Sequence, residues 1–106
     1  MGGAAQILQS EREALRSPHS IGERLSLMRN VFGMTQTDFG QGAGIKKSTY
    51  NQYENGKERP SLDEAIKLCD KYGLTLDWIY LGDTRGLSPD LSAAIEAMRR
   101  ARSEQQ

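Results

Sequence analysis

The sequence predicts an all-α fold. Apolar residues recur at helical spacing along almost the whole chain, and no stretch alternates as a half-buried strand would. A serine or threonine precedes most of these periodic stretches, as expected of residues that cap helix N-termini. With 106 residues, the chain is long enough for one compact domain with a modest core and too short for a second domain of full size.

Composition narrows the classes of protein to consider. The 14 basic and 14 acidic residues cancel, so the total charge gives no support for nucleic-acid binding. The single cysteine, Cys69, excludes an intramolecular disulfide, and no Cys and His residues have metal-ligand spacing, so neither a metal nor a cofactor is expected. Because neither a signal-peptide pattern nor an apolar run of ~18 residues is present, we expect a cytoplasmic protein without membrane contact.

The first core helix is expected to begin at Ser20 and to end near Gly33. Ser20 and Glu23 have the spacing of a reciprocal capping pair, which satisfies the first free amides of a helix. Four apolar residues then share one helical face: Ile21, Leu25, Met28 and Phe32.

Two short helices are expected next, joined by a tight turn. Thr35 can cap a helix from Gln36 to about residue 43, Gly44 suits a left-handed turn, and a second helix covers 47–54 until Asn55-Gly56 ends it. Gly40 leaves room for the second helix to approach the first. The side chains expected to point into the core are Phe39, Ala43, Ile45, Tyr50 and Tyr53.

Two more helices complete this unit. Ser61 and Glu64 form a second capping pair before a helix over 62–72, and Thr75 caps the last helix before Gly82. The faces expected to be buried are Leu62, Ala65, Ile66 and Cys69 in the first of these, and Leu76, Trp78, Ile79 and Leu81 in the second.

The predicted domain therefore covers 20–82, with an N-terminal arm (1–19) and a C-terminal segment (83–106) outside it. The arm can form a weak helix until Ser17-Pro18 interrupts it. In the C-terminal segment, Ser88 caps and Pro89 opens an amphipathic helix. The apolar residues of the arm are Ile7, Leu8 and Leu15, and those of the C-terminal helix are Leu91, Ala94, Ile95 and Met98.

Several separated motifs match one known family in register. They are Met34-Thr35-Gln36, Gly44-Ile45, Ser48-Thr49, Glu54-Asn55-Gly56-Lys57 and Pro60-Ser61. Through them the sequence resembles the helix-turn-helix family of the lambdoid phage repressors and Cro proteins, the xenobiotic-response-element type. The resemblance covers roughly Ile21 to Gly82 and implies a five-helix lambda-repressor-like DNA-binding domain, here extended by a C-terminal helix.

The second helix of the turn carries the residues expected to contact bases. Between Lys46 and Arg59 there are four basic and two acidic residues, a local excess that the neutral total hides. Gln52 can bond an adenine edge, Lys47 can donate to guanine O6 and N7, and Asn51 or Ser48 can supplement either. Helical spacing places these side chains together on the solvent side, where the alternative is an ordinary solvated face: Lys46, Lys47, Ser48, Asn51 and Gln52.

Other roles come from the resemblance. It implies phosphate contacts by Gln36, Asn55, Lys57 and Arg59, which would fix the register of the protein on DNA. It also implies a partly buried ion pair between Arg29 and Glu54, and the alternative is a direct phosphate contact by Arg29. Ser61-Leu62 replace an arginine that some phage repressors have after this proline, so no minor-groove insertion is expected from this loop.

These expectations lead to a homodimeric transcriptional repressor on an inverted-repeat operator. The proposed dimerisation stripe is Leu91, Ala94, Ile95 and Met98, extended by Leu87, and the alternative is that this stripe folds back on its own domain. The apolar residues of the N-terminal arm could share either role. The competing function is an antitoxin that binds a protein partner as well as its own promoter; an enzyme is not expected, because no catalytic arrangement of side chains is recognisable.

Overall fold

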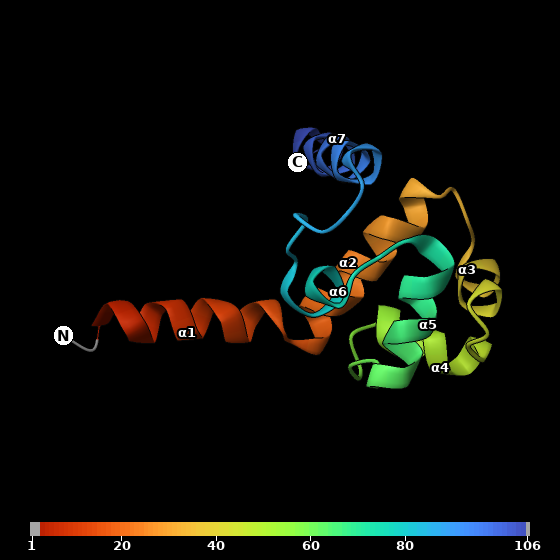
Figure 1. Ribbon diagram of the computed structural model, residues 1–106, viewed down its shortest axis with the longest axis horizontal. Coiled ribbons are helices and arrows are strands. Elements are labelled where there is room, and N and C mark those ends of the chain that lie inside the picture. Colours follow the sequence, from red (N-terminus) through yellow and green to blue (C-terminus); the bar gives the residue numbers. More distant parts are fainter. Residues whose placement is uncertain (1–2, 106) are drawn as a thin grey trace.

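The computed structural model describes residues 3–105 for the backbone and 8–105 for the side chains, and all the regular secondary structure in these residues is helical. Figure 1 shows a body from which the first helix projects as an arm, with the last helix lying along one side of it, where it contacts α2. The helices are α1 (Gly3–Leu15), α2 (Pro18–Val31), α3 (Gln36–Gly42), α4 (Lys47–Glu54), α5 (Leu62–Tyr72), α6 (Leu76–Leu81) and α7 (Pro89–Glu104). Among the described residues, none of the helices combines the length and the apolar character that a membrane-spanning helix needs.

Helix α2 begins earlier than the sequence predicts. Ser17, in extended conformation, is the N-cap, and its hydroxyl accepts from the Ser20 N–H at 3.1 Å. The prediction of a Ser20 cap is therefore wrong, because Pro18 at the first helical position starts the helix with its fixed φ and its missing donor. Glu23 lies 2.9 Å from the His19 ring instead of returning to the cap.

The helix-turn-helix follows the predicted boundaries. The Thr35 hydroxyl accepts from the Asp38 N–H at 3.1 Å and caps α3, as expected. Gly44 has a φ of +78° in the turn, which favours glycine. A Cβ at Gly40 would lie 2.8 Å from the Cβ of Tyr50, so glycine is required where α4 crosses α3.

Helix α5 presents a different face to the core from the predicted one. Ala65, Leu68 and Tyr72 are buried, whereas Leu62 and Ile66 are 57% and 40% exposed. The prediction for these two side chains is wrong. The helix is rotated because Tyr72 stacks on Phe39, with ring centroids 4.1 Å apart, and donates its hydroxyl to the Phe39 carbonyl.

In helix α6, the prediction holds for Trp78 and Ile79, which are fully buried, and fails for Leu76, which is 37% exposed. Leu76 is the first residue of this short helix, directly after the Thr75 cap.

The C-terminal helix belongs to the same core. Ile95 is fully buried, Leu87 is nearly so, and Leu91 and Met98 pack against the core with half-buried Ala94 beside them. Helix α7 packs chiefly against α2. The stripe proposed for dimerisation thus folds back on its own domain, the alternative that the sequence left open, and in this arrangement a dimer surface would need other residues.

The N-terminal arm touches the body at its end. Helix α1 contacts α2 and α6, while Leu8 and Leu15 are exposed. The side chain of Ile7 lies outside the described residues.

Candidate nucleic-acid interface

The structure brings the predicted base-contacting residues together on the outer side of α4. Tyr50 and Tyr53 are buried and fix the inner side of the helix against α2 and α3. On the outer side, Lys46, Lys47 and Ser48 are exposed, and Asn51 and Gln52 are half-buried. The result is a short helix with a rigid apolar base and a polar surface of donors and acceptors, which is the arrangement needed to read base edges.

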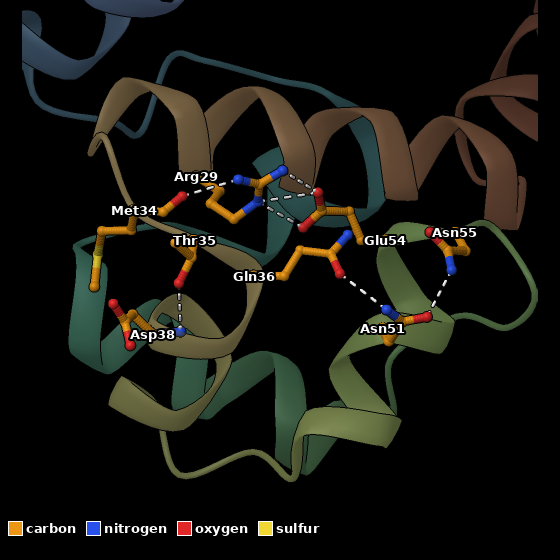
Figure 2. Close-up of polar contacts among 8 residues, drawn as sticks. All are labelled: Arg29, Met34, Thr35, Gln36, Asp38, Asn51, Glu54 and Asn55. Atoms are coloured by element: carbon orange, nitrogen blue, oxygen red, sulfur yellow. Dashed lines mark hydrogen bonds and ion pairs between the residues drawn. The ribbon is translucent and has the colours of Figure 1, made fainter.

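A chain of side-chain amides links α3 to the end of α4. The Asn51 Nδ2 donates to Gln36 Oε1 at 2.9 Å, and the Asn55 Nδ2 donates to Asn51 Oδ1 at 2.6 Å (Figure 2). Sequence reasoning assigned Asn51 to the bases and the other two to phosphates. In the structure Asn51 uses both ends of its amide to hold the other two in place.

The Arg29 and Glu54 side chains form a closely bonded ion pair. Nε of Arg29 lies 3.0 Å from each carboxylate oxygen, Nη2 lies 2.7 Å from Oε1, and Nη1 donates to the Met34 carbonyl at 2.8 Å (Figure 2). Only 4% of the Glu54 side chain and 18% of the Arg29 side chain are exposed. This geometry agrees with the ion pair that the family resemblance implied.

The protonation of this pair follows from its contacts. Burial raises the pKa of Glu54, but hydrogen bonds, chiefly those from Arg29, outweigh burial and lower the pKa below its ordinary value. The same bonds raise the pKa of Arg29. Both groups are therefore charged at neutral pH, and together they fasten the last turn of α2 to the end of α4.

The loop after α4 holds the remaining basic residues outward. Asn55, Lys57 and Arg59 are exposed, while Pro60 is buried and its carbonyl accepts from the Tyr80 hydroxyl at 2.8 Å. Gly56, with a φ of +74°, lets the chain turn directly after the helix. Two cations and an amide thus flank the C-terminal end of α4.

Two functional positions were missed by sequence reasoning. A Cβ at Gly22 would lie 2.6 Å from the Glu54 carbonyl oxygen, so this glycine allows α2 and α4 to approach closely. Arg24 is 6% exposed and bonds backbone carbonyls. For Gly22, the available signal was a glycine inside a helical pattern. For Arg24 there was no signal, because its hydrogen-bond partners are main-chain atoms.

The described residues contain no group of three or more His, Cys, Asp and Glu side chains that could hold a metal ion.

Comparison with known proteins identifies the unit that carries this surface. The helix-turn-helix family model matches residues 25–79. The chain belongs to the helix-turn-helix family. The matched residues run from the middle of α2 into α6 and so include the whole of α3 and α4.

Three relatives show the range of similarity. The chain is 30% identical over 57 residues to the transcriptional repressor RstR of a cryptic CTXphi phage in Vibrio cholerae, which covers 54% of this chain and 51% of RstR. It is 30% identical over 74 residues to the uncharacterised helix-turn-helix regulator YobD of Bacillus subtilis, covering 70% of the chain and 62% of YobD. It is 26% identical over 78 residues to antitoxin HipB of Escherichia coli K12, covering 74% of the chain and 85% of HipB.

The chain thus spans between half and two thirds of the first two of these relatives. No solved structure matches it.

Proposed function

We propose that the protein is a sequence-specific double-stranded DNA-binding transcriptional repressor that acts as a homodimer on an inverted-repeat operator. The observation that carries this proposal is the exposed polar face of α4, held on a buried base by Tyr50 and Tyr53. The similarity to a phage repressor supports it. Lys47 and Gln52 read bases, with Lys46 and Ser48 beside them, while Gln36, Asn55, Lys57 and Arg59 bind phosphates.

The test is selection of bound sites from a randomised DNA library. Gln52→Ala and Lys47→Ala should each lose about 1 to 3 kcal/mol of discrimination at one base pair. Arg59→Ala should weaken all sites alike and lower the salt slope by about one. Arg12→Ala, on the arm that projects away from α3 and α4 in Figure 1, is the matched control and should leave binding unchanged. Wild-type preference in both α4 variants would contradict this assignment.

The dimer requires a self-complementary surface outside the buried α7 stripe. We assign it to the exposed apolar residues of α5 and α6, Leu62, Ile66 and Leu76. Leu62 lies three residues after the proposed phosphate contact Arg59, so this surface would lie beside the DNA contacts of each copy. Two copies would then present α4 to half-sites about 34 to 36 Å apart.

Sedimentation and binding to one and two half-sites test the dimer. Ile66→Glu should yield a monomer that binds one half-site weakly, because a charge would be buried at the interface. Leu8→Glu, on the exposed arm, is the control and should stay dimeric. A dimeric Ile66→Glu variant would exclude this surface.

A second candidate function is that of an antitoxin, which the similarity to two HipB proteins favours because 80% and 85% of their lengths are matched. In that case the chain would also bind a protein toxin. Coexpression with the product of a neighbouring gene decides it: neutralised toxicity and a stoichiometric complex would favour the antitoxin, and autonomous promoter binding without such a gene would favour the simple repressor.

A further inference from the structure

A cavity of about 460 Å³ lies between the end of α1, one face of α2 from Ser20 to Leu27, and the last turns of α7. Three arginines line it, Arg24, Arg99 and Arg102, together with the apolar residues Leu15 and Leu27. We call it the arginine cavity. It lies on the side of the domain that includes α7, and all of its lining residues except Leu27 lie outside the range that the family model matches.

The positive charge of the cavity is poorly neutralised. Glu23 is the one carboxylate among its lining residues, and it lies 2.9 Å from the His19 ring. Arg24 is 6% exposed, and its hydrogen bonds go to the carbonyls of Ile79 and Leu15, not to a carboxylate. Its pKa is lowered to about 10 by burial and by repulsion from Arg99. The attraction of Glu23, which raises the pKa, is smaller than both effects. Three arginines therefore share one carboxylate, and a buried cation that is incompletely compensated is costly, so the site favours an anionic ligand.

The other two arginines can serve as movable donors. Arg99 lies over the Trp78 ring, 5.2 Å from its centroid, and only 3.6 Å separate it from the half-exposed Glu96. Such an exposed ion pair is weak and can be exchanged for a ligand at little cost. Arg102 makes no ion pair within the described part of the chain.

We propose that the arginine cavity binds a small organic anion, with a carboxylate or phosphate group held by the three arginines and an apolar part against Leu15 and Leu27. Guanidinium groups suit both kinds of anion because their donors match two oxygens at once. The apolar walls select for a ligand that carries a hydrocarbon portion beside its charge.

Ligand binding at this cavity has a route to the DNA-binding surface. Arg102 also lines a second cavity of about 450 Å³, together with Glu54 and Asn55 at the end of α4. An anion that draws Arg102 into the arginine cavity removes positive charge from beside Asn55, and so weakens DNA binding. This step rests on the proposed function, whereas anion binding itself does not.

The first experiment measures anion binding without DNA. Trp78 is the single tryptophan, and Arg99 covers it, so its fluorescence reports on the cavity. Hexanoate should give a saturable change in wild type, inorganic phosphate should bind more weakly, and neutral hexanamide should give none. Arg102→Gln should weaken hexanoate binding about tenfold, while Arg100→Gln, a neighbour on α7 that does not line the cavity, should bind as wild type.

Calorimetric titration with hexanoate repeats the comparison without relying on the tryptophan, and circular dichroism checks that each variant is folded. No saturable binding of hexanoate, or equal affinity in Arg102→Gln and wild type, would overturn the proposal.

A second titration with operator DNA tests the coupling between the arginine cavity and the DNA-binding surface. Saturating hexanoate should lower DNA affinity about fivefold in wild type and not in Arg102→Gln. If hexanoate bound normally but did not change DNA affinity, the coupling would be contradicted and the anion-binding site would stand.

Discussion

Helix α2 carries two arginines that are both withdrawn from solvent but are compensated in different ways. Arg29 faces α4 and bonds both oxygens of the Glu54 carboxylate. Arg24 faces the other side of the domain and bonds the carbonyls of Leu15 and Ile79. The charge of Arg29 is thus cancelled within the fold, whereas the charge of Arg24 is met by main-chain dipoles.

The difference separates two sides of α2, which we call the fixed side, facing α4, and the adaptable side, facing α1, α6 and α7. Toward α4, the ion pair holds the position of the helix that carries the candidate base contacts. Toward α1, α6 and α7, Arg24 joins carbonyls at or near the ends of two helices, where the backbone carries partial negative charge. Dipoles neutralise a cation less completely than a carboxylate does, so this side keeps an excess of positive charge that a ligand can satisfy.

The largest effect is expected from breaking the fixed side. Arg29→Met should lower the free energy of unfolding by about 3 to 5 kcal/mol, because it strands a carboxylate that is 4% exposed. Denaturant unfolding followed through Trp78 measures this, with Arg59→Met, an exposed arginine, as the matched control. Equal midpoints for the two variants would contradict the ion pair's structural role and restore a direct DNA role for Arg29.

A smaller loss is expected on the adaptable side. Arg24→Met should lower the free energy of unfolding by about 2 kcal/mol, because two carbonyls lose their donor while the repulsion from Arg99 is relieved. Amide hydrogen exchange should increase in α1, whose last carbonyl Arg24 holds. If Arg24→Met were as costly as Arg29→Met, main-chain dipoles would be compensating this charge as well as a carboxylate does.

Lowering the pH should destabilise the protein less than Arg29→Met does. Because the pKa of Glu54 is lowered in the folded protein, the contribution of this carboxylate to the free energy of unfolding is complete above its unfolded pKa of about 4.3. That contribution is lost as the pH falls through the folded pKa. In Arg29→Met the sign reverses, since burial then raises the pKa of Glu54 and protonation relieves the buried charge. The stability gap between wild type and variant should therefore narrow between pH 7 and pH 4 in denaturant titrations. A constant gap would mean that Glu54 is not the titrating group.

The sequence predicted the fixed side far better than the adaptable one. The caps at Thr35 and Ser61 and the glycine at Gly44 act within a few residues, so local patterns are enough to place α3, α4 and α5. The Arg29 and Glu54 pair was reached only through the family resemblance, because 25 residues separate the partners in the chain.

The other side depends on contacts that leave no mark in the sequence. Arg24 donates to main-chain carbonyls, which every residue has, so the identity of the partner residue could not be predicted from its type. Beside α3, the rotation of α5 was missed for a related reason, because it follows from the stacking of Tyr72 on Phe39, residues of different helices. Apolar periodicity predicted the amphipathic α7 correctly, but periodicity alone could not distinguish packing on α2 from packing on a second copy.

The smallest effect is expected from the amide chain on the fixed side. Asn51 holds Gln36 and Asn55, so Asn51→Ala should leave both proposed phosphate contacts less well aligned. DNA affinity should fall by about 0.5 to 1.5 kcal/mol, the usual contribution of a hydrogen bond. The loss should be similar for all DNA sequences, because phosphates carry no sequence information. Parallel binding curves on the best site and on single-base variants measure this, with Gln52→Ala as the comparison that should change preference. If Asn51→Ala also changed the preferred base at one position, Asn51 would be a base contact, as the sequence alone suggested, and the amide chain would be rearranged when the protein binds DNA.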